Sequence, residues 1–168
     1  MKNLFYSILF VVFIQQTVKC QVNEYNSIDI NSMTLKKSVN NNNSSLIIEK
    51  NQFISVFGNP SSSNNQVSEI DDLEYFKAYY LENSFWFVND KLGVIILKDS
   101  SFEIIYNNNN SFKVGNNINY LNSLFPISFS ARKDNQIFIS INNQALKTDS
   151  FLVFNYNNSN VITEISIQ

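Results

Sequence analysis

The chain of 168 residues contains no histidine and only one cysteine, Cys20. Histidine is the commonest general base and metal ligand in proteins. Its absence excludes Ser–His and Cys–His nucleophile pairs and argues against zinc, copper and haem sites. Only carboxylate, lysine or tyrosine chemistry is left for an enzyme. We therefore expect no cofactor, no metal site and no enzymatic activity.

The chain also lacks a large excess of positive or negative charge. The chain has 12 basic and 14 acidic residues and no block of basic residues. A protein that binds nucleic acid needs a basic patch to neutralise phosphates, so nucleic acid is not expected as a partner. A single cysteine cannot form a disulfide within the chain, which means that packing has to stabilise the fold.

The first twenty residues have the layout of a secretory signal peptide. Lys2 supplies a positive start, and an apolar run of eleven residues (4–14) follows. This run is too short to cross a bilayer, which needs about 20 apolar residues. We predict cleavage between Cys20 and Gln21, which makes residues 21–168 a single exported domain, either secreted or periplasmic.

Cys20 also has an alternative role. A cysteine directly after an apolar leader can be the lipidated first residue of a bacterial lipoprotein, and the chain would then be a membrane-tethered assembly or structural factor. That pathway requires a small residue before the cysteine, whereas this chain has Lys19. Plain secretion is therefore the first prediction and lipidation the alternative.

Residues 21–168 indicate an α+β domain, with an antiparallel β-meander sheet and two short helices in two tandem helix-plus-meander units (45–106 and 114–167). In the first unit, the spacing of Phe53 and Phe57 predicts a short helix. Gly58-Asn59-Pro60 ends it, because glycine suits the position after a helix and proline cannot continue one.

Apolar runs bounded by turn residues predict the strands of both meanders. The first unit continues with a polar loop (61–66), an acidic patch (69–74) and strands at 75–81, 85–88, 92–98 and 102–106. The second has a helix at 118–125 that Asn116 or Asn117 caps and Pro126 ends, then strands at 136–142, 151–156 and 161–167. A lead-in arm (22–35) contributes one strand near 28–30.

A helix closing in Phe57-Gly58-Asn59-Pro60, followed by a meander that contains Asn89-Asp90-Lys91-Leu92, resembles the tandem domains of two groups of exported bacterial proteins. These are the β-lactamase-inhibitor-protein fold and the small outer-membrane assembly lipoproteins. The resemblance covers residues 45–167. It implies helices on one face of a sheet, a second face able to bind a partner protein, and no catalytic residues.

Asparagine is abundant, with runs at residues 40–43 and 107–110. Each run lies between apolar segments, where asparagine favours turns and tolerates left-handed backbone, so both runs are predicted to be turns. Four asparagines begin an N-x-S/T sequon, which matters only if the host glycosylates exported proteins. They are Asn42, Asn43, Asn109 and Asn157.

Aromatic residues on the first-unit strands are the candidate binding site. Successive strand residues point to opposite faces, and here both faces carry apolar or aromatic groups. If helices cover one face, the other exposes Tyr75, Tyr79 and Trp86, which are residue types favoured at protein interfaces. The alternative is that the N-terminal arm or the other helix covers this face and makes it part of the core.

The acidic patch is the other candidate for chemistry. Its carboxylates are Glu69, Asp71, Asp72 and Glu74. They lack the alternating pattern of a calcium loop, so a solvated loop is the favoured interpretation. The leading hypothesis for function is a non-enzymatic exported module that binds another protein. A carboxylate-dependent extracellular hydrolase is a third and weaker hypothesis.

Overall fold

The computed structural model describes residues 25–67 and 73–168. The predicted cleavage site at Cys20 and Gln21, the alternative lipid anchor, and the carboxylates Glu69, Asp71 and Asp72 lie outside these residues. The described part is an α+β fold that is rich in sheet and has few short helices. None of its helices is long and apolar enough to cross a membrane.

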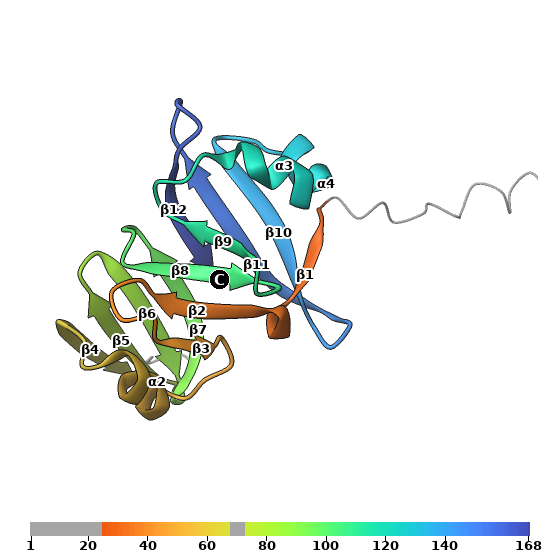
Figure 1. The fold of residues 1–168 in the computed structure, drawn as a ribbon. Coiled ribbons are helices and arrows are strands. Elements are labelled where there is room, and N and C mark those ends of the chain that lie inside the picture. Colours follow the sequence, from red (N-terminus) through yellow and green to blue (C-terminus); the bar gives the residue numbers. More distant parts are fainter. Residues whose placement is uncertain (1–24, 68–72) are drawn as a thin grey trace, which may run out of the picture.

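Eight strands form the larger sheet, in the order β1-β10-β11-β12-β7-β6-β5-β4 (Figure 1). All neighbours are antiparallel except β1 and β10. The strands are β1 (Ser27–Asp29), β4 (Ser62–Val67), β5 (Glu74–Tyr80), β6 (Asn83–Val88), β7 (Lys91–Leu97), β10 (Gln136–Asn143), β11 (Leu146–Tyr156) and β12 (Ile162–Ile167).

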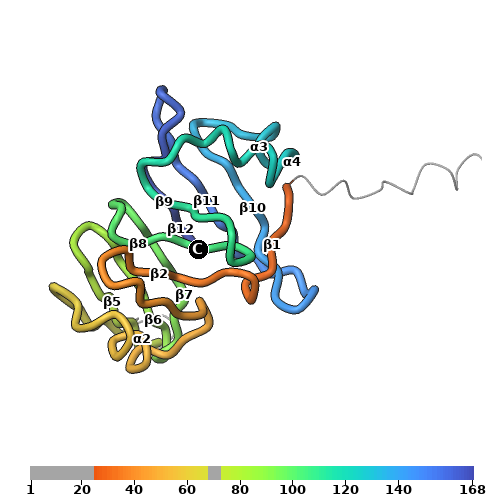
Figure 2. Tube along the Cα trace, viewed as in Figure 1, coloured from red at the N-terminus to blue at the C-terminus, as the bar shows by residue number. Residues whose placement is uncertain are grey.

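A second sheet of four strands has the order β3-β2-β8-β9. Its strands are β2 (Met33–Lys37), β3 (Asn43–Ser45), β8 (Phe102–Tyr106) and β9 (Asn110–Lys113). The helical segments are η1 (Ile30–Ser32), α2 (Lys50–Phe57), η2 (Ile118–Tyr120), α3 (Leu121–Leu124) and α4 (Pro126–Ser130). Figure 2 shows α2 at one end of the molecule and α3 with α4 at the other, and the small sheet between them.

The core lies between the larger sheet and the elements that pack on its inner face. Phe53 of α2 is fully buried, and its ring centroid lies 4.8 Å from that of Phe85 and 5.3 Å from that of Phe87. At the other end, Phe112 of β9 lies 5.3 Å from Phe154 of β11 and 6.0 Å from Phe125, measured between ring centroids. Two aromatic clusters therefore join both sheets and the helices.

Local predictions of helix ends and turns are confirmed. Gly58 follows α2 with a φ of 84°, and the Asn117 side chain caps η2 by accepting from the backbone N–H of Asn119. Asn41 and the pair Asn107 and Asn108 have positive φ in the turns that leave β2 and β8. Both asparagine runs thus supply left-handed turn residues, as their composition predicts.

Several element predictions are wrong. Residues 61–66, predicted to be a polar loop, lie largely in β4, because the chain pairs with β5 over six residues. Pro126 begins α4 at its first position rather than only ending a helix, where its fixed φ and missing N–H are tolerated. The expected arm holds a second strand, β2, besides β1.

The tandem-unit scheme stays a prediction. The segment predicted as the last strand of the first meander is β8, which pairs with β2 and β9 rather than with β7. The strand β9 was not predicted at all. In β12, Ile162 and Ile165 are both buried although their spacing predicts opposite faces, because the β11–β12 register shifts next to Tyr156.

Candidate functional site

The candidate site is the outer face of the larger sheet around β5, β6 and β7, which is the face turned away from α2. Buried residues of these strands include Ala78, Phe85 and Phe87, which belong to the inner face. Residues between them in sequence point the other way. We use "outer face" for Tyr75, Lys77, Tyr79, Ser84, Trp86, Val88, Val94 and Ile96.

Cross-strand pairing holds these residues next to one another. Lys77 lies opposite Trp86, and Tyr79 lies opposite Ser84. On the next strand, Val94 is the partner of Trp86. A register shift after Trp86 brings Leu92 opposite Phe87, so Leu92 packs against the core while Val94 stays on the outer face. The three predicted aromatic residues therefore share one face of two adjacent strands.

Trp86 is the centre of this arrangement. The Lys77 ammonium lies 3.9 Å from the centroid of the Trp86 ring, a cation–π geometry that fixes the ring against β5. The Trp86 side chain is half-buried. Its indole N–H is buried and has no hydrogen-bond acceptor in the described part of the chain, which costs about 1–3 kcal/mol in an ordinary protein interior.

Within the described residues neither α2 nor β1 covers this face, and the alternative in which the N-terminal arm or the other helix covers it stays a prediction. Helix α2 packs on the inner face through Phe53. The strand of the lead-in arm, β1, lies at the far edge of the sheet, beyond β10, and four strands separate it from β6. Tyr75, Tyr79 and Trp86 are each half-buried rather than fully buried.

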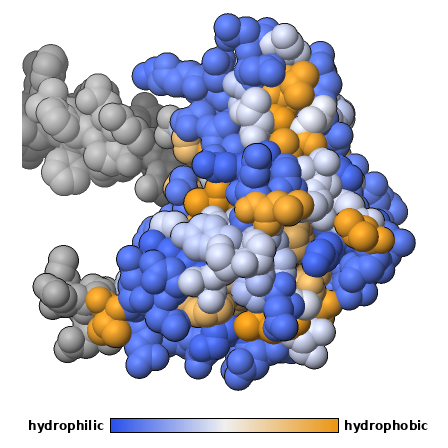
Figure 3. Space-filling view, turned by 90° about the vertical axis from the view of Figure 1, so that its left-hand side faces the viewer, coloured by the Kyte–Doolittle hydropathy of each residue, from blue (hydrophilic) through white to orange (hydrophobic). Residues whose placement is uncertain are grey.

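A hollow of about 420 Å³ lies where the outer face meets the edge strand β4. Its lining includes Gln66 and Val67 of β4 together with Tyr75, Lys77 and Trp86. Apolar surface elsewhere is divided into small separate patches on the side that Figure 3 displays. Scattered apolar residues of this kind are normal on soluble proteins, whereas the outer face gathers aromatic groups around one hollow.

Beyond β7, the same side of the sheet carries a polar ladder, and past it Tyr25 packs against Phe138 and Phe151. In the ladder, the carboxylate of Glu164 lies 3.5 Å from the Lys98 ammonium and accepts a hydrogen bond of 3.0 Å from the Asn155 amide. Asn155 in turn accepts a bond of 2.7 Å from the Gln136 amide. This ladder runs from Lys98, directly after β7, across β12 and β11 to β10. The aromatic end is thus bounded by a polar margin.

Glu74 is the one carboxylate of the predicted acidic patch that the structure describes. Its side chain is exposed, and it lines a hollow of about 350 Å³ with Asp90 and Lys50. Asp90 is already paired with the Lys50 ammonium, and its side chain is 62% exposed. Two exposed carboxylates, one of them ion-paired, form an open rim rather than an enclosed acid–base pair.

No cluster of three or more potential metal ligands occurs within residues 25–67 and 73–168. The strongest polar network that the sequence did not reveal centres on Asn83, which is fully buried. Its amide donates to Asp99 at 2.8 Å and to the Ser101 hydroxyl at 2.9 Å. Its carbonyl oxygen accepts from the backbone N–H groups of Lys98 and Asp99. The sequence suggested only a turn residue here.

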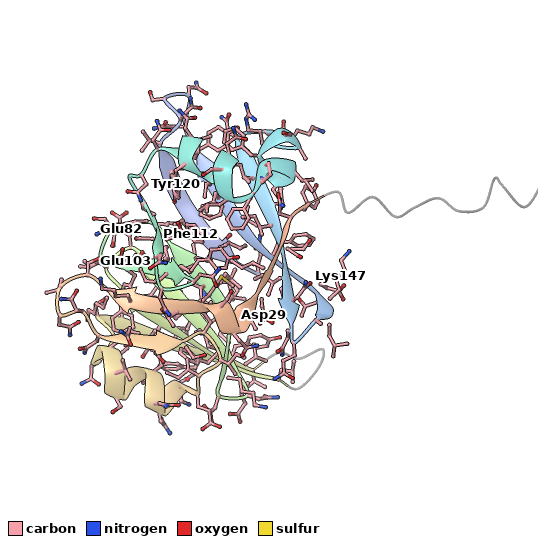
Figure 4. The ribbon with its side chains drawn as sticks, turned by 45° about the vertical axis from the view of Figure 1, so that its right-hand side comes forward. Asp29, Glu82, Glu103, Phe112, Tyr120 and Lys147 are labelled. Atoms are coloured by element: carbon pink, nitrogen blue, oxygen red, sulfur yellow. The ribbon has the colours of Figure 1, made fainter. Side chains whose placement is uncertain are left out.

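Two carboxylates near this network have shifted pKa values. Burial raises the pKa of Asp99, but hydrogen bonds from Ser101, Asn83 and the Glu82 backbone outweigh burial, so the net pKa is lowered. Burial likewise raises the pKa of Glu103, and the Ser111 hydroxyl and Lys36 outweigh it. Figure 4 shows Glu82 and Glu103 on the same side of the molecule.

A broad hollow of about 730 Å³ borders the Asn83 network. Val39 and Leu81, 84% and 74% exposed, lie on its rim. Two of the charged groups that line it are already engaged, since Lys113 donates to the Ser38 hydroxyl at 3.1 Å and Asp99 accepts from Asn83, whereas Glu82 is exposed. The hollow therefore offers fewer free polar groups to a ligand than its size suggests.

Comparison with protein-family models, with curated proteins and with solved structures finds no match. The resemblance to exported tandem-domain proteins therefore stays a prediction, and function has to be argued from the geometry of this chain.

Proposed function

We propose that the chain is an exported, non-enzymatic module that binds another protein on its outer face. The observation that supports this best is the grouping of Tyr75, Tyr79 and Trp86 on two adjacent strands, on the side of the sheet away from α2. Large rigid aromatic side chains lose little conformational entropy on binding and dominate the energetics of protein interfaces. The signal-peptide-like leader supports export.

The chemistry of the face indicates the kind of partner that fits it. Val94 and Ile96 beside Trp86 provide apolar area, so the partner contributes apolar side chains to the centre of the contact. Lys77 supplies a positive charge next to Trp86. A partner carboxylate that approaches Lys77 would pair with it, and partial desolvation would strengthen that pair.

The experiment is affinity capture from the source organism, read by mass spectrometry. The wild-type protein is compared with a Trp86→Ala/Tyr79→Ala variant and with a matched control, Ile127→Ala/Leu146→Ala, which removes two exposed apolar residues from other elements. We expect one partner that the wild type and the control retain and the outer-face variant loses. Hot-spot truncation costs about 2 kcal/mol or more, or roughly 30-fold in affinity for each residue.

Circular dichroism and thermal unfolding show whether the outer-face variant is folded. A folded variant that still captures the same partner with unchanged affinity contradicts the proposal. Loss of capture by the control variant to the same degree contradicts it as well, because the effect would then not depend on the outer face. If the variant is unfolded, the single conservative changes Tyr79→Phe and Trp86→Phe replace it in the same comparison.

A further inference from the structure

The edge strand β4 (Ser62–Val67) combines exposed side chains with complete pairing to β5. All six of its residues are exposed, and all six are paired with β5 in continuous register, from Ser62 opposite Tyr79 to Val67 opposite Glu74. Its other side has no partner strand within the described part of the chain, because β4 is the last strand of the larger sheet. Figure 1 shows it at the margin of the molecule.

β4 has none of the features that usually protect such an edge. Natural edge strands are short, carry charges or proline, or contain a bulge, because a free row of backbone groups otherwise pairs with another chain. β4 has the sequence Ser-Ser-Asn-Asn-Gln-Val, with no charge and no proline. The opposite edge of the same sheet is different, since β1 has only three residues and ends in Asp29.

Two hydrogen bonds identify which β4 backbone groups point outward. The N–H of Asn89 donates to the Glu74 carbonyl, so that carbonyl points toward β6, whereas the Tyr79 carbonyl points toward β4 and accepts from Ser61. Alternate residues of a strand direct their backbone groups to opposite sides. The β4 residues that face β5 are therefore Ser62, Asn64 and Gln66, and the outward groups belong to Ser63, Asn65 and Val67.

We propose that β4 pairs antiparallel with β4 of a second copy of this chain, which joins the two larger sheets into one. A two-fold axis perpendicular to a continuous sheet requires some residue to lie opposite itself. Centring the pair on Asn65 uses every outward residue, because Asn65 then faces Asn65 of the second copy and Ser63 faces Val67. Each of these pairs exchanges two backbone hydrogen bonds.

The side chains of β4 are self-complementary in this register. Asn65 meets its own copy, and Asn64 meets Gln66, so carboxamides that both donate and accept face each other. No like charges are brought into contact. The nearest cation is Lys77, which lies opposite Asn64 on β5. The two copies of Lys77 would be at least about 14 Å apart, three strand spacings, which exceeds the screening length of about 8 Å at physiological ionic strength.

This proposal does not rest on the proposed function, because it is argued from the backbone groups of the β4 edge, although Gln66 and Val67 also line the hollow beside the outer face. Pairing by one strand buries less surface than a standard interface. We therefore expect a dimer that dissociates on dilution, with mostly monomer at about 1 µM and mostly dimer at about 1 mM. Sedimentation velocity of the wild-type protein measures this directly. Monomer throughout that concentration range overturns the proposal.

Charge substitutions test whether β4 is the contact. In Asn64→Lys/Asn65→Lys, the change at position 65 places like charges face to face across the two-fold axis and the change at position 64 adds charge to the same edge, which should abolish the dimer. The matched control Asn119→Lys/Asn122→Lys, at exposed positions of η2 and α3, should not. Mixing the lysine variant with Asn64→Glu/Asn65→Glu should restore a dimer of the two. Equal loss in the control, or failure of the mixed pair to associate, overturns the assignment to β4.

A disulfide tests the register. In a Cys20→Ser background, Asn65→Cys places two thiols at Cα positions about 5.5 Å apart, within the range that a disulfide spans. Asn64→Cys places them about 8 Å apart, beyond that range. We expect an oxidised dimer from Asn65→Cys alone on non-reducing gels. Cross-linking of Asn64→Cys to the same extent, or of neither variant, overturns the register centred on Asn65.

Discussion

Replacement of Asn83 by leucine tests the buried polar network most sharply. Asn83 is fully buried, and its carbonyl oxygen accepts hydrogen bonds of 2.9 Å from the Lys98 N–H and 3.2 Å from the Asp99 N–H. Its amide donates to the Asp99 carboxylate and to Ser101. Leucine has a similar length but can make none of these bonds, and it leaves little room for water to replace them.

The expected loss follows from the groups left without partners. Each buried N–H that loses its acceptor costs about 1–3 kcal/mol, and a carboxylate that loses a donor costs more than a neutral group. Asp99 keeps its bond from the Ser101 backbone N–H, 2.7 Å long, and part of its contact with water, which reduces its share. We therefore expect Asn83→Leu to lower the free energy of unfolding by about 3 kcal/mol.

The assay is urea unfolding followed by circular dichroism, with Asn119→Leu as the control at an exposed asparagine. A loss of about 3 kcal/mol corresponds to a fall in Tm of about 6–12 °C for a domain of this size. The control should change stability by less than about 0.5 kcal/mol. A loss below about 1 kcal/mol for Asn83→Leu would refute the reasoning, since the network could then be replaced without cost.

Other predictions concern acid stability and packing. Asp99 and Glu103 have lowered pKa values in the fold. Their stabilising contribution is present above their unfolded pKa of about 4 and is lost as the pH falls through the lower folded values. The urea midpoint of unfolding should therefore fall as the pH is lowered from 6 to 2, and it should fall less in Asp99→Asn. The same pH dependence in that variant as in the wild type counts against the network. In calorimetric unfolding, Phe53→Ala should lower the free energy of unfolding by about 3–5 kcal/mol. Gln52→Ala, at the exposed neighbouring position, should lower it by less than about 0.5 kcal/mol. Similar losses in the two variants would contradict the α2 packing. Gly58→Ala should cost about 1–3 kcal/mol from its φ of 84° alone, because no atom lies within 4 Å of an added Cβ; full stability of that variant would contradict the described backbone.

Short-range patterns predicted the parts of the fold that depend on neighbouring residues. The helix that ends at Gly58, and most strands from β5 to β7 and from β10 to β12, follow from spacing and turn residues. The shared face of Tyr75, Tyr79 and Trp86 follows from strand alternation and hairpin pairing, which are both local. The register shift at Gly93 was not predicted, although an isolated glycine within a strand pattern is a signal for a bulge.

Long-range pairing explains what the sequence could not reveal. Five of the six residues of β4 are polar, and the segment forms a strand because it pairs with the edge of β5. β8 looks like the next strand of a meander but joins β2, which is more than sixty residues earlier in the chain. The alternation of buried Met33 and Leu35 was a visible signal for β2. Asn83 was predicted to be a turn residue. The turn is formed by Leu81 and Glu82, and Asn83 is buried at the start of β6.

The central claim is that the outer face binds a protein partner, and the fluorescence of Trp86 tests it most directly. Trp86 is the only tryptophan of the chain, so its emission reports on the centre of the outer face without substitution or labelling. The measurement is a titration of the protein with its captured partner or a tryptophan-free version of it, with acrylamide quenching at each end of the titration. We predict a blue shift of the emission and protection from acrylamide as the partner covers the ring. Saturable binding with an unchanged Trp86 spectrum and unchanged quenching would contradict the account, because the partner would then occupy another surface.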